Sequence, residues 1–419
     1  MKAVILAAGQ SSRFRPLSDR RHKGLTEVLG KPIIQHTIEE LREAGVDEII
    51  VVQGPERNIE NELGDLADTY VVQEEPKGMG NALEQAREHL SGNFLVLTPY
   101  RANASQFFES MIQRAEEEED SEIVFVSTPT DEPQKYGILE FDDSGEKAVD
   151  MVEKPSGEPP SDQKVVGMYL LHENFFDHLD EVEEWEYQYE DALSLQMQQK
   201  PASVLKIDEE TNSIKYPWDL FSVVEELMEE RDQEVSGEAD IADSAEIKGD
   251  VIVEPGARVY ENAVVKGPAY IGQDATVGNN AVVRDHVALE EDVTVGANCE
   301  VKNTVFQPGS SIHSQYIGDS VVGRDTKIGA GTIVANRRFR EDGKRPPVES
   351  DLIGKDYSKD TGREFLGTFI GENVDIGVNV SIMPGVQVGS DSKIGPGTVV
   401  HEKVEHGETV YVEQDVERK

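Results

Sequence analysis

Residues 241–277 read IADSAEIKGDVIVEPGARVYENAVVKGPAYIGQDATV, with a large aliphatic side chain at every sixth position. The same spacing continues to Val301 and, after interruptions, as far as Val400. A period of six belongs neither to a helix nor to a single strand. It is typical of a hexapeptide β-helix, in which each six-residue side contributes one inward aliphatic residue and a tight corner. The repeats therefore predict a parallel β-helix.

The repeats also predict the domain boundaries. The β-helix should span residues 239–402, with an insertion at 337–369 where the spacing is interrupted. A polar stretch precedes it, so we place an N-terminal domain at 1–232 and a C-terminal tail at 403–419.

The first half of the chain alternates strand and helix patterns. Ala3–Leu6 and Glu48–Val52 are short apolar runs, and residues 33–44 between them carry apolar side chains at helical spacing. A helical pattern at 80–90 and an apolar run at 93–97 continue the alternation. This order predicts a Rossmann-like α/β domain with a mixed, mostly parallel sheet.

The amino-acid composition is strongly acidic. The chain has 83 Asp and Glu against 40 Lys and Arg, a formal net charge of −43. Such a surface repels nucleic acid and anionic membranes, so we expect neither as a partner. We interpret the excess as a halophilic adaptation for solubility in concentrated salt. No run approaches membrane-spanning length, and the protein is expected to be cytoplasmic.

A loop near the N-terminus combines small residues with cations. Leu6, Ala8 and Gly9 end the first predicted strand, and such a strand end exposes backbone N–H groups that can bind phosphate. Arg13 and Lys23 belong to a basic cluster in the following residues. A basic cluster in an acidic chain indicates an anionic ligand, although a solvated charged loop is the alternative.

Several motifs in this half resemble one enzyme family. Residues 6–18 read LAAGQSSRFRPLS, 22–32 read HKGLTEVLGKP, and 73–82 read QEEPKGMGNA. Tyr136-Gly137, the VEKP at 152–155 and the EYQYED at 186–191 follow in the same order. Together they resemble the nucleotidyltransferases that join a nucleoside triphosphate to a sugar-1-phosphate.

The resemblance implies roles for individual residues. Arg13 and Lys23 would hold the triphosphate, and Gln73 and Gly78 would bind the base, with UTP or dTTP as donor. The residues implied for the sugar phosphate are Gly137, Glu153, Lys154 and Glu186. The sugar phosphate would attack the α-phosphorus in line and release pyrophosphate.

The chain departs from the family at the metal site. The family binds Mg²⁺ with two aspartates, and this chain has Tyr100 and Ser213 at those positions. We therefore assign no metal ligand, because neither side chain is a usual ligand of Mg²⁺. Lys215 could supply positive charge instead, or acids at 208–210 could bind the ion from a shifted loop.

The second half resembles another enzyme. Residues 310–320 read SSIHSQYIGDS and 328–336 read IGAGTIVAN, similar to the acetyltransferase half of the bifunctional enzymes that make UDP-N-acetylglucosamine, in their archaeal form. The resemblance makes His313 the general base, with acetyl-CoA as co-substrate. The residues implied for the acceptor and coenzyme A are Arg284, Lys302, Tyr316 and Asn336. It also implies a left-handed β-helix and a homotrimer.

Three hypotheses follow. The chain is a bifunctional enzyme, an acetyltransferase whose N-terminal domain binds nucleotide without turnover, or a non-catalytic regulatory paralogue. A surface imidazole at a repeat corner is the alternative for His313. The preferred sugar and base stay open.

Overall fold

The computed structural model describes residues 1–100, 104–117, 122–208, 214–229, 231–413 and 417. They form two compact units. Unit 1 comprises residues 1–10 and 33–213, and unit 2 comprises residues 11–32 and 214–419. This division differs from the boundary predicted near residue 232, because the segment Ser11–Pro32 and the chain from Ile214 onward group with the repeats.

Unit 1 is built on a nine-stranded sheet in the order β5-β4-β1-β6-β10-β7-β11-β9-β8. Its strands are β1 (Lys2–Ala7), β4 (Glu48–Gln53), β5 (Thr69–Val72), β6 (Asn93–Leu97), β7 (Ile123–Pro129), β8 (Gly137–Phe141), β9 (Lys147–Glu153), β10 (Gln163–His172) and β11 (Ala202–Lys206). The sheet is mixed, as predicted. Four neighbouring pairs among these described strands are parallel and four are antiparallel, a larger antiparallel share than expected. The reason is that the long strand β10 runs antiparallel to both β6 and β7, and β8 and β9 form a hairpin.

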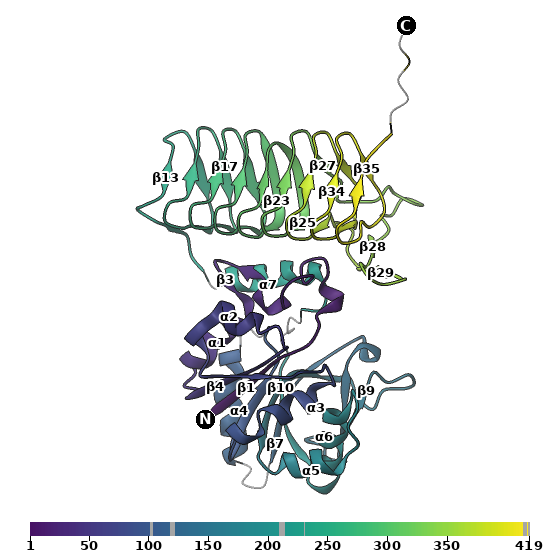
Figure 1. Ribbon diagram of the computed structural model, residues 1–419. Helices are drawn as coiled ribbons and strands as arrows, with labels where there is room; N and C mark the ends of the chain where they lie inside the picture. The colour runs from purple at the N-terminus through teal and green to yellow at the C-terminus, as the bar shows by residue number, and fades with distance from the viewer. Residues whose placement is uncertain (101–103, 118–121, 209–213, 230, 414–416, 418–419) are drawn as a thin grey trace. The chain divides into compact units, whose positions relative to one another are not determined.

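Helices cover both faces of this sheet (Figure 1). They are α1 (Ile33–Glu43), α2 (Asn58–Leu63), α3 (Met79–Gln85), α4 (Ala104–Glu117), α5 (Phe175–Glu181) and α6 (Gln188–Gln199). Inward residues of alternating strand positions, such as Val4 and Leu6, pack in one core cluster with residues of α3, α5 and α6. Burial of both faces explains why the strands are continuously apolar.

Unit 2 contains the β-helix, whose coils run as a row of short parallel strands (Figure 1). Val259 pairs with Val277 and Val277 with Val295, so one coil advances by 18 residues, or three sides of six. The predicted aliphatic column lies inside: all three residues are 0–1% exposed. Buried aliphatic surface contributes about 25 cal/mol per Å², so this column is the main source of stability of the coil.

The strands of the β-helix are short. They are β12 (Glu234–Val235), β13 (Asp240–Ile241), β14 (Glu246–Lys248), β15 (Val251–Val253), β16 (Arg258–Val259), β17 (Val264–Lys266), β18 (Ala269–Ile271), β19 (Thr276–Val277), β20 (Val282–Arg284), β21 (Val287–Leu289), β22 (Thr294–Val295), β23 (Cys299–Phe306), β24 (Ser311–Ile312), β25 (Gln315–Val322), β26 (Lys327–Ile328), β27 (Ile333–Val334), β30 (Phe369–Ile370), β31 (Asp375–Ile376), β32 (Ser381–Ile382), β33 (Gln387–Val388), β34 (Lys393–Ile394), β35 (Val399–Val400) and β36 (Thr409–Val410). The insertion carries its own antiparallel pair, β28 (Glu349–Asp351) and β29 (Ser358–Asp360).

The coil ends later than predicted. Val404, assigned to the tail from its sequence, is 3% exposed, belongs to the core cluster and bridges Val388. Strand β36 then pairs with β34. The tail residues 403–410 therefore extend the β-helix. Val404 follows Val400 after four residues instead of six, and Val410 follows Val404 after six, so both continue the series of inward aliphatic positions.

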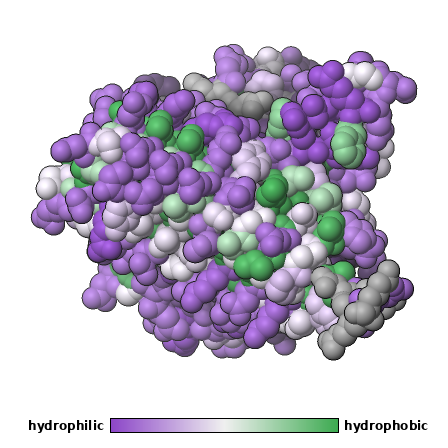
Figure 2. All heavy atoms as spheres, turned by 90° about the horizontal axis from the view of Figure 1, so that it is seen from above, coloured by the Kyte–Doolittle hydropathy of each residue, from purple (hydrophilic) through white to green (hydrophobic). Residues whose placement is uncertain are grey.

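The surface is predominantly hydrophilic. Figure 2 shows polar and charged residues over most of the face it presents, with hydrophobic residues gathered in smaller areas. No helix within the described residues is long and apolar enough to cross a membrane.

Candidate active sites of the two units

The basic segment Ser11–Pro32 folds into two single-turn 3-10 helices, η1 (Ser12–Phe14) and η2 (Lys23–Leu25). Phe14 is fully buried and anchors the first. The Ser18 hydroxyl donates to the Ser11 carbonyl at 2.8 Å and closes the loop between them. The segment therefore has a defined local structure that presents Arg13 and Lys23.

Three cations gather at Lys23. Its Nζ donates to the carbonyl of Ile214 at 2.5 Å. Burial, and then repulsion by Arg13 and Lys215, lowers the pKa of Lys23 to about 7, against an opposing effect of Asp219. Cations that converge in this way form a site that a multivalent anion would stabilise.

In unit 1 the structure brings together the residues predicted to bind the base. The Gln73 side chain is buried, and its Nε2 donates to the Gly78 carbonyl at 3.1 Å and to Asn81 Oδ1 at 3.0 Å. Gly78 has φ +99°, and a Cβ there would lie 2.4 Å from the Glu186 carbonyl oxygen. Only glycine fits this position, which explains the QExxxG spacing.

The strand end that was predicted to bind phosphate is open. Leu6 lies in β1, and Ala8 and Gly9 follow directly. Among the described residues nothing lies within 4 Å of a Cβ built on Gly9, so its backbone can be approached closely.

Three of the four predicted sugar-phosphate residues lie together, while the backbone of the fourth, Glu186, lies against Gly78. Gly137 and Glu153 are register partners in β8 and β9. Lys154 Nζ lies 2.6 Å from the Glu153 carboxylate and 5.4 Å from the centre of the Tyr187 ring. The segment therefore forms a compact polar site on one hairpin.

Sequence reasoning missed Glu190. Burial, followed by repulsion from Glu153, raises the pKa of Glu190 to about 7. Its Oε2 is buried without a hydrogen-bond partner in the described part of the chain. The signal was present in the EYQYED segment at 186–191. The nucleotidyltransferase motif that it resembles is E-Y-x-x-T-D, and Glu190 stands at the threonine position.

The described residues do not fit a protein-held magnesium ion. Tyr100 follows β6 and offers a phenol where a carboxylate is expected. Ser213, Glu209 and Glu210 lie outside the described residues. Within the described ranges, no three or more His, Cys, Asp or Glu side chains are grouped closely enough to hold a metal.

In the β-helix, one buried carboxylate joins the predicted acceptor residues. Asp319 is 2% exposed and accepts from Lys302 Nζ at 3.3 Å, Asn303 Nδ2 at 2.8 Å and Asn336 Nδ2 at 2.6 Å. Asn336 also donates to the Tyr316 hydroxyl at 2.8 Å. Lys302, Tyr316 and Asn336 are thus held together by Asp319, which sequence reasoning missed although it belongs to the GDS motif.

Arg284 lies beside this cluster, where its charge opposes the rise that burial causes in the pKa of Tyr316. Arg284 is the register partner of Lys302, but its guanidinium pairs with Glu300 at 2.7 Å. His313 is exposed after β24, and its backbone N–H donates to Ile328. A Cβ at Gly296 would lie 2.1 Å from the His313 carbonyl, so neighbouring coils pack tightly here.

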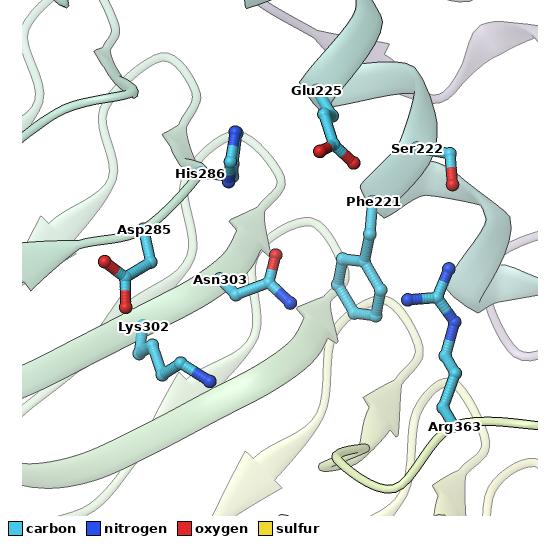
Figure 3. A pocket seen from close by; sticks show the side chains of 8 residues that line it. All are labelled: Phe221, Ser222, Glu225, Asp285, His286, Lys302, Asn303 and Arg363. Carbon is cyan, nitrogen blue, oxygen red and sulfur yellow. The ribbon is translucent and has the colours of Figure 1, made fainter.

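A cavity of about 250 Å³ lies beside Lys302. Helix α7 (Leu220–Glu229) supplies Phe221 and Glu225 to its wall. Figure 3 shows Phe221 between Asn303 and Arg363, and the Arg363 guanidinium lies 5.5 Å from the Phe221 ring centre. Cations from β23 and from the insertion thus line one cavity of unit 2.

Comparison with known proteins agrees with both halves. Residues 2–216 match the family model described as "Nucleotidyl transferase", residues 265–383 match "GMPPB C-terminal domain", and residues 367–402 match "Bacterial transferase hexapeptide (six repeats)".

With two relatives, the match covers nearly the whole of both chains. The chain is 32% identical over 416 residues to the "Bifunctional sugar-1-phosphate nucleotidylyltransferase/acetyltransferase" of Sulfurisphaera tokodaii, covering 97% of this chain and 99% of the relative. It is 37% identical over 423 residues to the "Bifunctional protein GlmU" of Methanococcus maripaludis, covering 99% and 98%. The "UTP--glucose-1-phosphate uridylyltransferase AglF" of Haloferax volcanii is 29% identical and covers 56% of this chain and 99% of that relative. The chain therefore belongs to the nucleotidyl transferase family, in its bifunctional form with a hexapeptide-repeat acetyltransferase half.

Proposed function

We propose that the chain transfers a nucleotidyl group from UTP or dTTP to a sugar-1-phosphate in one active site and an acetyl group from acetyl-CoA to an amino-sugar phosphate in another. Family membership supports the pairing of the two reactions. The observation that carries the nucleotidyl transfer is the convergence of Arg13, Lys23 and Lys215, since it supplies the positive charge that a triphosphate requires.

For nucleotidyl transfer, Arg13 and Lys23 hold the triphosphate while Gln73 and Gly78 contact the base. Leu6, Ala8 and Gly9 provide backbone groups, and Glu153, Lys154, Gly137 and Glu186 orient the sugar phosphate. A phosphate oxygen of the sugar attacks the α-phosphorus, the bond to the β-phosphate oxygen breaks, and pyrophosphate leaves. Positioning and charge neutralisation account for most of the acceleration of such reactions.

For acetyl transfer, His313 takes the proton from the amine of the sugar as nitrogen attacks the thioester carbonyl. The C–S bond then breaks, and the thiolate of coenzyme A receives a proton. Lys302, Tyr316 and Arg284 bind the acceptor, and Asn336 approaches acetyl-CoA. The network on Asp319 supports this assignment because it holds three of these residues in one orientation.

Two assays at high salt test the proposal. The first measures pyrophosphate release from UTP and dTTP with glucose-1-phosphate or N-acetylglucosamine-1-phosphate, with and without Mg²⁺. The second measures free thiol from acetyl-CoA and glucosamine-1-phosphate. Thiol release without pyrophosphate release would mean that the N-terminal half binds nucleotide but is not catalytic. The absence of product in both assays would mean that the chain is a regulatory paralogue.

Nucleotide binding should take up a proton. With its pKa near 7, the Lys23 amine is about nine-tenths neutral at pH 8. A bound triphosphate favours the charged form, so binding at pH 8 should consume close to one proton, and binding at pH 6 much less. Calorimetric titration in buffers of different ionisation enthalpy measures this number. A heat that does not depend on the buffer would contradict it.

Removal of the Asp319 carboxylate should destabilise the β-helix and impair acetyl transfer. The D319A variant leaves Lys302, 23% exposed at its side chain, without its buried counter-charge, and such losses amount to about 3 kcal/mol. Asp325 provides the control, because it has a similar left-handed backbone (φ 56° against 53°) but is exposed. Denaturant unfolding of D319A and D325A should differ by most of that energy; equal losses would refute the role of the network.

The proposal includes a left-handed coil and a homotrimer, as the family resemblance implies. Three aliphatic side chains of the C-terminal coils, Ile333, Val378 and Val399, are 46%, 46% and 56% exposed. Exposed aliphatic residues of this kind are suited to contact between chains. Sedimentation equilibrium tests the stoichiometry.

A further inference from the structure

The turn that ends the basic segment is held by a buried carboxylate of the β-helix. Leu29 and Gly30 connect β2 (Glu27–Val28) to β3 (Lys31–Pro32), both with left-handed backbone at φ 53° and 78°. Glu290 is fully buried at the corner after β21. Its Oε1 accepts the Leu29 N–H at 2.9 Å, and its Oε2 accepts the Gly30 N–H at 2.7 Å. One side chain thus satisfies both donors of the turn.

Tyr270 completes this socket. It is 3% exposed in the preceding coil, and a Cβ on Gly30 would lie 2.4 Å from its hydroxyl oxygen. The turn therefore fits the coil only with glycine at this position. Leu29 is 5% exposed and is buried with it.

The next coils hold Glu27, the first residue of β2. The Gln307 side chain, 4% exposed, donates to the Glu27 carbonyl at 2.7 Å and accepts the Glu27 N–H at 2.9 Å. It therefore pairs with the segment as a neighbouring strand would. The Glu27 carboxylate forms an ion pair with Arg324, and both side chains are mostly buried.

The middle of the segment is tied to later coils. Asp19 accepts the Ser390 backbone N–H at 3.2 Å, and Arg21 pairs with Glu372 at 3.3 Å. Both contacts use corner residues that follow a glycine in the repeat, Gly389 and Gly371. Corner residues of the coil thus hold the basic segment in its middle and near its C-terminal end.

We propose that the β-helix positions the triphosphate-binding residues, with Glu290 as the main positioning residue for nucleotidyl transfer. The inference rests on the proposed function. Arg13 and Lys23 lie on two single-turn helices, which are marginal without tertiary support. A buried carboxylate with two backbone donors supplies that support at a defined place. A shift of about 1 Å in a positioned cation is enough to lower a rate about 100-fold.

The E290A variant should lower kcat/KM for the nucleoside triphosphate about 100-fold, mainly through KM, with acetyl transfer unchanged. The E290Q variant keeps the volume and one of the two acceptors, so it should fold and show an intermediate loss. Thr398 provides the control. Its buried hydroxyl donates to the Gly395 carbonyl at 2.7 Å within the coil, so T398V should lower the melting temperature without changing either activity.

Hydrogen exchange of the full chain gives a readout that does not depend on turnover. Amides of 12–25 should exchange faster in E290A than in T398V at equal thermal stability. Exchange unchanged in this segment, or equal losses of both activities in E290A, would overturn the positioning role. A wild-type chain that releases no pyrophosphate would refute the proposed function, while the exchange result would still decide the positioning.

Discussion

Replacement of His313 by alanine should lower kcat of acetyl transfer by about 10²–10⁴-fold, because a positioned general base contributes that much. Nucleotidyl transfer should be unaffected. The His313 side chain is exposed after β24, so its loss should leave the melting temperature nearly unchanged. The measurement is thiol release from acetyl-CoA over a range of pH.

A matched surface histidine distinguishes a base from a structural residue. His401, 70% exposed at its side chain, provides the control, since H401A should retain the wild-type rate of thiol release. A thiol-release rate in H313A equal to that of H401A would exclude His313 as the base.

Replacement of Lys23 by methionine should lower kcat/KM of nucleotidyl transfer by about 10²–10³-fold, the usual effect of removing one donor to a developing charge. Lys23 is surrounded by Arg13 and Lys215, so methionine also relieves repulsion in the free protein. The apo K23M variant should therefore be at least as stable as the wild type at pH 7, although it binds triphosphate weakly.

Two further results check this role. The proton uptake expected on nucleotide binding at pH 8 should vanish in K23M. K393M removes an exposed lysine of the coil and should retain both uptake and rate. If K23M releases pyrophosphate at the wild-type rate, the three cations do not form the triphosphate site.

Tyr100 and Ser213 stand where the resemblance implies aspartate ligands of Mg²⁺. The cluster of Arg13, Lys23 and Lys215 therefore matters for neutralising the charge of the phosphates. Tyr100 offers a phenol instead of a carboxylate, and a cation at Lys215 can neutralise part of the phosphate charge. Pyrophosphate release measured across Mg²⁺ concentrations therefore reports how much of the neutralisation the side chains provide.

The sequence by itself determined the repeat architecture. It also determined most of the motifs that resemble the nucleotidyltransferases. Each coil of a β-helix repeats the same inward position, so the aliphatic period of six is a local signal that needs no knowledge of distant contacts. The QExxxG segment is local only in part. The Gln73 side chain donates to the Gly78 carbonyl five residues later, but the backbone that leaves no room for a Cβ at Gly78 is that of Glu186.

Only the tertiary structure decided which parts of the chain belong together. Glu290, Asp319 and Gln307 act through hydrogen bonds to residues up to 280 positions away. Such pairs leave no periodic trace, because each depends on one buried polar group meeting one partner. For that physical reason, the grouping of Ser11–Pro32 with the coil, and the extension of the coil to Val410, could be read only from the folded chain.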